Sequence, residues 1–397
     1  MEESWTPALA GVTNKEGTLG TAIEPFHLQI DQEALDDLAR RLDAIRWPEK
    51  ETVGDWSQGV PLSQLQALCR YWQESYDWRR CEAWLNGIGQ YKTDIEGLGI
   101  HFLHKRSPEP NALPLLITHG WPGSVIEFQK IIGPLTDPVA HGGRAEDAFH
   151  IVAPSLPGYG FSDKPNEQGW NVPKIANAWC ELMRRLGYEH FVAQGGDWGS
   201  AVTTTIAGLA RPEVRGVHLN MVIALPSGSE RGSLNEKEQA ALARAERYRA
   251  EGNGYAQQQS TRPQTLGYGL VDSPVGQAAW IYEKFYEWTD CAGDPCTILT
   301  YDEILDNIML YWLPGTAASS ARLYWESFRR FAADPIDIPI ACSIFPQDIF
   351  VPTRKWAERK YRNIIHWNEL EKGGHFAAFE QPDLFVSELR QAFRTLR

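Results

Sequence analysis

Residues 191–200 read FVAQGGDWGS, and this stretch decides how the chain folds. An apolar run ends in two glycines, Asp197 follows, and a helical pattern continues from Ser200 to Ala210. Small residues two positions before and two positions after Asp197 permit the strained strand-to-helix turn of a nucleophile elbow. Taken alone, the motif is equally consistent with an Asp that caps a helix in a glycine-rich turn. Other segments must therefore decide between the two interpretations.

A carboxylate in the nucleophile position favours one class of reaction. Most elbows carry Ser at this position, whereas this one carries Asp197. Attack by a carboxylate on an sp³ carbon gives an alkyl ester, which water can cleave afterwards. The motif therefore indicates displacement chemistry, either the opening of an epoxide or the removal of a halide. An ordinary esterase is disfavoured because the elbow lacks Ser.

Short apolar runs on both sides of the elbow predict a parallel sheet. Those before residue 220 are separated by segments of helix length, which is typical of an α/β fold with helices on both faces of the sheet. The six runs that we expect to be strands are 113–120, 150–160, 191–197, 214–220, 336–346 and 363–370.

The segment ahead of these runs predicts an N-terminal extension over residues 1–92, followed by the first part of the core over 93–221. Residues 1–22 lack periodicity and are expected to form a mobile arm. Apolar residues then recur at helical spacing in three places, and we expect helices from Asp31 to Pro48, from Ser63 to Trp72 and within 77–92, the last ending near Gly87.

Residues 222–330 differ in character and predict a helical lid inserted into the core. Ser233 and Glu236 have the spacing of a capping box before a long helix that Gly252 can end. The rest of the segment is helical in pattern, rich in Tyr and Trp, and has no strand-like run. We expect the core to resume over 331–397.

Two segments after the lid supply an acid and a base in the chain order expected of an elbow-based triad. Asp348 follows the fifth apolar run and His375 follows the sixth. Asp337, which precedes a strand, and Glu369, at the end of a strand, are the alternative acids. His366 is a competing base, but it lies inside an apolar run and is interpreted as structural.

The loop HGWPG (119–123) follows the first apolar run of the core. A loop at this position can supply one backbone N–H group of an oxyanion hole, here from Trp121, with the N–H of Trp198 as its partner. Pro122 stiffens the turn and permits a cis peptide bond after Trp121. We expect the substrate pocket to be lined by Trp121, Pro122, Trp198 and Phe376.

Composition excludes several classes of function. The chain has 397 residues, 43% of them hydrophobic, and a formal net charge of −13, which disfavours nucleic acid and anionic membranes as partners. Six cysteines in a chain of this length do not suggest a disulfide scaffold, and without a metal or nucleotide motif no cofactor is expected. The sequence shows neither a signal peptide nor an apolar run of membrane-spanning length, so a cytoplasmic location is expected.

Four motifs together resemble those of the epoxide hydrolases of the microsomal and fungal type, which have an α/β-hydrolase fold. They are HGWPGS (119–124), SLPGYGFS (155–162), GGDWGS (195–200) and GGHFAAFE (373–380). The N-terminal segment is similar to the extension of that family as well. The resemblance implies that Asp197 opens the epoxide, that His375 activates water to cleave the ester, and that Asp348 assists His375. This chain lacks the membrane anchor of the microsomal members, so it is closer to the soluble fungal and bacterial kind.

The resemblance also implies two lid tyrosines that act as acids towards the epoxide oxygen. By local pattern the first matches Tyr255, ahead of the STRP stretch (260–263), and the second matches Tyr324 in ARLYWES. The lid segment holds several other tyrosines, and without the resemblance no two of them could be singled out.

A haloalkane dehalogenase is the nearest alternative, because it shares the fold, the Asp and the His. Members of that family typically have Asn where this chain has Trp121, although Trp198 could serve half of a halide site. A catalytically inactive binding domain is an alternative of another class, and the complete set of Asp197, Asp348 and His375 argues against it. The expected partners are a small hydrophobic epoxide and water, with a homodimer through the lid as a further expectation.

Overall fold

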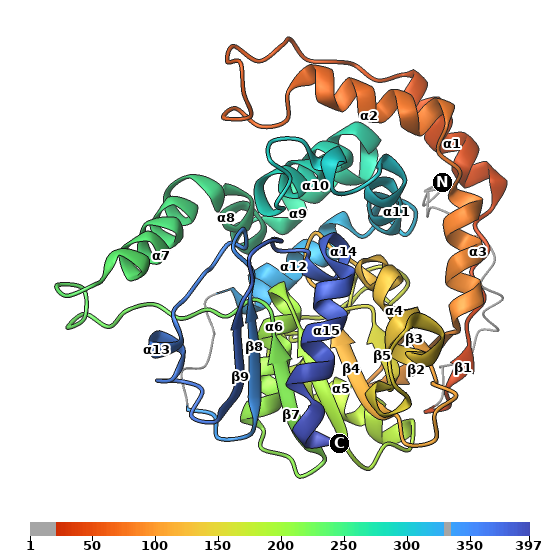
Figure 1. The fold of residues 1–397 in the computed structure, drawn as a ribbon. Coiled ribbons are helices and arrows are strands. Elements are labelled where there is room, and N and C mark those ends of the chain that lie inside the picture. Colours follow the sequence, from red (N-terminus) through yellow and green to blue (C-terminus); the bar gives the residue numbers. More distant parts are fainter. Residues whose placement is uncertain (1–20, 329–334) are drawn as a thin grey trace.

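A single, mostly parallel sheet forms the centre of the molecule (Figure 1). The structure is a computed structural model that describes residues 21–328 and 335–397. Within this part of the chain nine strands follow the order β1-β2-β3-β5-β4-β6-β7-β8-β9. They are β1 (Glu24–Pro25), β2 (Gln90–Ile95), β3 (Leu98–Lys105), β4 (Leu113–Thr118), β5 (Phe149–Pro154), β6 (Phe191–Gly195), β7 (Val214–Leu219), β8 (Ile340–Ile344) and β9 (Ile364–Glu369).

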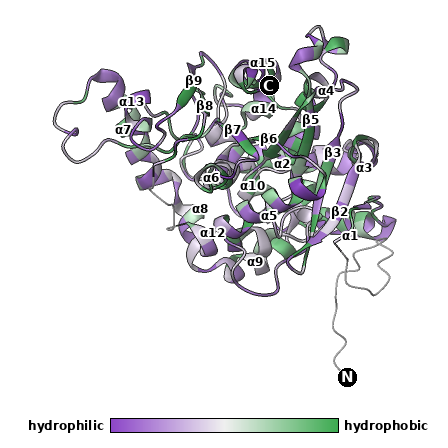
Figure 2. Ribbon diagram, turned by 90° about the horizontal axis from the view of Figure 1, so that it is seen from below, coloured by the Kyte–Doolittle hydropathy of each residue, from purple (hydrophilic) through white to green (hydrophobic). Residues whose placement is uncertain are grey.

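The predicted α/β architecture is confirmed, since each of the six apolar runs contains a strand. Strands β4 to β9 pair in parallel, and the middle ones are buried along their length because helices cover both faces. Strand β9 lies at the edge and is only partly buried. Figure 2 shows the hydrophobic residues following the central strands, whereas the outlying helix α7 (Glu236–Arg247) is largely hydrophilic.

An antiparallel hairpin, β2 and β3, extends the sheet at its other edge and was not predicted from the sequence. The third helix was expected to end near Gly87, and it ends at Ile88, where Gly89 takes a φ of 101° and the chain then enters β2. Glu96 and Gly97 form the turn with φ values of 53° and 80°, the two positive values that a tight hairpin turn requires. Strand β2 also crosses the boundary placed at residue 92.

Helices cover the two faces of the sheet and its upper edge. The extension contributes α1 (Gln32–Asp43), α2 (Leu62–Glu74) and α3 (Trp78–Ile88), close to the three predicted helices. None of the helices within the described ranges has the length and apolar character needed to cross a bilayer. The helices of the core are η1 (Val125–Phe128), α4 (Gln129–Thr136), η2 (Val139–His141), η3 (Ala145–Asp147), α5 (Val172–Arg185), α6 (Asp197–Gly208), α13 (Arg354–Ala357), α14 (Ala377–Glu380), α15 (Pro382–Ala392) and η6 (Arg394–Leu396).

Between β7 and β8 the chain forms a loop up to residue 235 and is then mostly helical in its described part. The helices of this segment are α7, η4 (Tyr248–Gly252), α8 (Gly254–Thr261), α9 (Pro263–Asp272), α10 (Pro274–Trp288), η5 (Pro295–Thr297), α11 (Tyr301–Trp312) and α12 (Ala317–Ser327). The capping box of α7 is formed by Asn235 and Glu238, so the pairing of Ser233 with Glu236 was wrong. The Ser233 hydroxyl instead donates to the carbonyl oxygen of Glu230.

The N-terminal extension packs along one side of the molecule, from the sheet edge to the lid (Figure 1). The fully buried carboxylate of Asp306, on lid helix α11, accepts hydrogen bonds from Arg80 and from the Tyr76 hydroxyl, both at 2.8 Å. Trp56 stacks on the lid residue Tyr286 with ring centroids 4.0 Å apart. The extension and the lid therefore share a polar and an aromatic contact. The predicted mobile arm lies, apart from its last two residues, outside the described residues.

Candidate active site

Asp197 stands in a strained turn between β6 and α6. Its φ is 47°, a left-handed conformation that a non-glycine residue adopts only where the surroundings enforce it. A side chain at Gly199 would overlap the carbonyl oxygen of Thr118, and one at Gly195 would overlap that of Gly199. Gly196, not Asp197, is the N-cap of α6. The alternative interpretation of Asp197 as a helix cap is therefore wrong, and the turn has the geometry of a nucleophile elbow.

The HGWPG loop closes over the carboxylate of Asp197. The backbone N–H of Trp121 donates to Asp197 Oδ1 at 2.8 Å, and the Trp121–Pro122 peptide bond is cis. Gly120 makes the approach possible, because a Cβ at this position would overlap the Asp197 carboxylate. The lid holds the loop in place, since Asn307 donates to the carbonyl oxygen of Pro122 at 2.7 Å.

His375 lies between two carboxylates. Its Nδ1 is 2.7 Å from Asp348 Oδ1, and its Nε2 is 3.3 Å from Asp197 Oδ2. His375 is 4% exposed and Asp348 is 1% exposed, so water screens neither contact. The three residues thus lie in the order Asp348, His375, Asp197. The imidazole can reach the carboxyl group of Asp197 and the space beside it.

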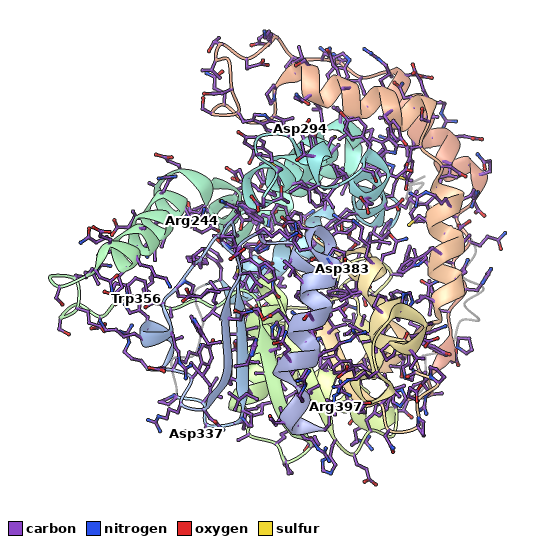
Figure 3. The ribbon with its side chains drawn as sticks, viewed as in Figure 1. Arg244, Asp294, Asp337, Trp356, Asp383 and Arg397 are labelled. Atoms are coloured by element: carbon purple, nitrogen blue, oxygen red, sulfur yellow. The ribbon has the colours of Figure 1, made fainter. Side chains whose placement is uncertain are left out.

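The alternative acids and the competing base lie elsewhere. Asp337 pairs with Arg362 and lies at the lower end of the sheet, away from Arg244 and the lid (Figure 3). Glu369 pairs with Lys237, and His366 Nε2 bonds to Glu388 at 2.9 Å. Of the acids considered from the sequence, only Asp348 contacts His375 among the described residues.

Two lid residues hold the loops that carry Asp348 and His375, and neither contact was predicted from the sequence. Arg244, on α7, donates to the backbone carbonyl oxygens of Pro346 and Asp348. The backbone N–H of His375 donates to the carbonyl oxygen of Trp288 at 2.8 Å. These contacts join segments about a hundred residues apart, and no local pattern predicts them.

Glu380 is a further residue whose role was missed, although it lies inside the GGHFAAFE motif. Its carboxyl group accepts hydrogen bonds from the backbone N–H groups of Gly374, Phe376 and Asp290 at 2.9–3.0 Å. The side chain therefore fixes the turn on both sides of His375. Its spacing of five residues from the base was the available signal.

The charge of His375 follows from its two neighbours. Burial alone would lower the pKa of His375, but the carboxylates of Asp348 and Asp197 raise it to about 10. The imidazole is therefore protonated at neutral pH. Loss of the charge on either neighbour would lower this pKa and convert His375 towards a base.

Aromatic side chains surround the other side of Asp197. Tyr255 and Tyr324 are both buried, with ring centroids 5.8 Å apart. Trp121 stacks on Tyr255 at 4.8 Å, and Trp198 contacts Tyr324 edge-on at the same centroid distance. The hydroxyl of Tyr248 lies 3.0 Å from that of Tyr255. The structure thus brings both sequence-predicted tyrosines together beside the elbow.

Both tyrosines keep their protons. Burial raises the pKa of Tyr255 and of Tyr324 well above the usual value, and the neighbouring phenols and the Asp197 carboxylate raise it further. Each group is therefore a neutral phenol that can donate a hydrogen bond to a ligand in this pocket. Of the expected pocket residues, Trp121 and Phe376 line a small cavity against Asp197, and Pro122 is buried. The described residues contain no cluster of three side chains suited to a metal ion.

Comparisons with known proteins agree with this geometry. Residues 23–128 match the family described as epoxide hydrolase N terminus, and residues 114–270 match the alpha/beta hydrolase fold family. A protein of Stigmatella aurantiaca (strain DW4/3-1), provisionally named an epoxide hydrolase, is 59% identical over 94% of this chain and 86% of its own length. Epoxide hydrolase 1 of Sus scrofa is 36% identical over 93% of this chain and 88% of its own length. The structure of Aspergillus niger epoxide hydrolase has a TM-score of 0.86 at 32% identity, covering 96% of this chain and 98% of that one.

The raised pKa of His375 predicts how its imidazole titrates. In ¹⁵N NMR spectra the ring should lose its proton near pH 10, and Asp348→Asn should lower this value because one of the two stabilising carboxylates is neutralised. Since the folded-state pKa lies above the unfolded value of about 6.5, the interaction stabilises the fold fully below about pH 6.5. That stabilisation is lost as the pH rises through about 10. Titration of the His375 ring below pH 6.5 in the parent protein would contradict the assignment.

Proposed function

This chain belongs to the epoxide hydrolases, hydrolases that act on ether bonds, and we propose that it converts a hydrophobic epoxide to a vicinal diol through an ester of Asp197. The observation that carries the proposal is the row Asp197–His375–Asp348 with two neutral tyrosines close to the nucleophile. The residue roles are inferred from these distances and from the charges that they imply.

The first step is attack by the carboxylate. The N–H of Trp121 binds Oδ1 of Asp197, and a carboxylate oxygen forms a bond to one epoxide carbon while the carbon–oxygen bond of the ring breaks. The epoxide oxygen becomes a strongly basic alkoxide, which requires a proton or strong hydrogen bonds as it forms. Tyr255 and Tyr324 are positioned to donate them, because both phenols remain neutral in the pocket.

The second step is cleavage of the ester. Ester formation removes the negative charge of Asp197, which is one of the two charges that hold the pKa of His375 high. The imidazole can then release its proton and act as the base that activates water, while Asp348 orients the ring. The N–H groups of Trp121 and Trp198 would bind the oxyanion that develops at the Asp197 carboxyl group. The first step thereby prepares the base for the second.

The aromatic cluster beside Asp197 favours an apolar epoxide. It includes the indole rings of Trp121, Trp198 and Trp288, the last with its ring centroid 5.0 Å from that of His375. Aromatic faces bind apolar groups, so aryl-bearing and terminal epoxides fit the proposal.

Removal of the base should trap the ester. His375→Gln, mixed with styrene oxide, should gain the mass of one substrate on the peptide that contains Asp197, since the first step needs no base. The double variant Asp197→Asn, His375→Gln is the control and should gain no mass. Intact-protein mass spectrometry followed by peptide mapping makes the measurement. An unmodified mass in the folded single variant would refute the ester mechanism, and an adduct with a bromoalkane alone would favour dehalogenation.

Loss of the phenols should slow the first step. Tyr255→Phe or Tyr324→Phe should each reduce the rate of alkylation in a single turnover, and the double variant should lose about 10²–10⁴-fold, the usual contribution of general acids. Tyr282→Phe is a matched control, because this buried lid phenol has no hydrogen-bond partner among the described residues. A double variant that alkylates at the parental rate would refute the assignment of the acids.

A homodimer through the lid is part of the proposal. Tyr268 and Val271 on α9 and Trp325 on α12 are 71%, 42% and 50% exposed, and α9 packs against α12. Exposed apolar side chains of this size on adjoining helices are typical of an interface. Light scattering should give twice the chain mass for the parent and the single mass for Trp325→Asp. Ile365→Asp, at an exposed apolar site on β9, is the control. A monomeric parent protein would refute the dimer.

We also propose a cytoplasmic location. The six cysteines are free thiols, which suits a chain that works in a reducing compartment. Fractionation of the source cells tests this proposal, and recovery of the protein outside the cytoplasmic fraction would refute it.

A further inference from the structure

A small cavity lies against Asp197 and His375, and it shares Trp121 and Phe376 with the aromatic side of the site. The centre of a water molecule can occupy a volume of about 20 Å³ in this cavity, which is enough for one water molecule. Among the described residues its lining contains neither Tyr255 nor Tyr324. It includes instead residues at the carboxyl ends of the strands, such as Thr118 and Gln194.

The polar atoms of this wall are suited to a bound water. Thr118 is fully buried and Gln194 is 1% exposed, yet Thr118 Oγ1 and Gln194 Oε1 have no hydrogen-bond partner among the described residues. An unpaired buried polar atom costs about 1–3 kcal/mol, so such atoms usually bind ordered water. His375 and Asp197 complete the wall, which brings the proposed base and the carbon to be attacked to the same small space.

Glu127 lies in the wall together with the ionisable side chains of Asp197, His375 and His119, and the proposed mechanism does not use it. Ser124 caps the short helix η1, and Glu127 at its third position bonds back to the Ser124 backbone, so one function of the side chain is to cap. The carboxyl group also packs over Gly123, where any Cβ would overlap it. This close packing directs the carboxyl group into the wall shared with Asp197 and His375.

The charge state of Glu127 fits a hydrogen-bonding function. Burial raises the pKa of the Glu127 carboxyl group to about 8, although His375 opposes this shift. The group is then mostly protonated at neutral pH, and it can both donate and accept a hydrogen bond.

We infer that this cavity holds the water that cleaves the Asp197 ester, and that Glu127 is a positioning residue that binds this water beside His375. The inference rests on the proposed function. In this step the water oxygen forms a bond to Asp197 Cγ, and its proton passes to His375 Nε2. The bond from the carboxyl carbon to the alkyl oxygen then breaks, and that oxygen leaves with the proton as the second hydroxyl of the diol.

Substitution of Glu127 tests the inference through the two separate chemical steps. Rapid quenching with styrene oxide, followed by intact-protein mass spectrometry, measures formation and loss of the alkyl-enzyme. Glu127→Leu should alkylate within about 3-fold of the parent but cleave the ester about 10-fold or more slowly, the effect of one lost hydrogen bond to a reacting group. Glu127→Gln keeps a donor and an acceptor, and it should cleave within about 3-fold of the parent. Glu127→Leu that cleaves at the parental rate, or Glu127→Gln as slow as Glu127→Leu, would overturn the assignment of Glu127.

A second pair of variants tests the cavity itself without altering the helix cap. Thr118→Val removes a hydroxyl from the wall, whereas Thr203→Val removes an equally buried and unpartnered hydroxyl outside it. Only Thr118→Val should slow ester cleavage, by about 3-fold or more, as one water contact is lost. Equal cleavage rates in the two variants would overturn the water site.

The trapped ester of His375→Gln separates this inference from the proposed function. If the alkyl-enzyme forms in His375→Gln but does not accumulate in Glu127→Leu, only the role of Glu127 is overturned. Absence of adduct from every variant, including His375→Gln, would overturn the proposed ester mechanism and the inference with it.

Discussion

The left-handed backbone of Asp197 is the constraint on which the rest of the structure depends. A non-glycine residue holds this conformation only if its neighbours prevent relaxation, and here β6, α6 and the close approach of Gly199 to Thr118 do so. The strain turns the carboxylate away from the sheet and towards the Trp121 N–H and His375. Sheet, helix and loop are thus arranged to present one side chain, and the stability of the parallel sheet offsets the cost of the turn.

The second constraint is electrostatic, because four carboxyl groups lie around one imidazole. Burial raises the pKa of Glu127 to about 8 and that of Glu380 to about 7, whereas the imidazolium of His375 lies directly between Asp197 and Asp348. The two aspartates contact the imidazolium directly, whereas the two glutamates do not. The other two carboxyl groups can act as hydrogen-bonding groups, one beside the cavity and one at the backbone of the base loop.

The sequence predicted the features that depend on local patterns, which include the elbow, the six parallel strands and the α/β fold. It failed where two local patterns competed or where distant segments meet. Ser233 with Glu236 and Asn235 with Glu238 have the same spacing, and only the start of α7 distinguishes them. The β2–β3 hairpin was missed because its first strand mixes polar with apolar residues and lacks a continuous apolar run. Tyr255 and Tyr324 came from family resemblance, since their proximity arises only when α8 and α12 pack together.

The lid is joined to the acid and base loops through main-chain atoms. Arg244 binds the carbonyl oxygens of Pro346 and Asp348, and Trp288 accepts from the backbone N–H of His375. Backbone atoms are common to every residue type, so substitutions in these loops leave the docking points of the lid in place. The side chains of the pocket can then diverge during evolution, or be exchanged by an engineer, without losing the alignment between lid and core. The side-chain atoms of these residues therefore determine which substrate binds, whereas their backbone atoms hold the lid on the core.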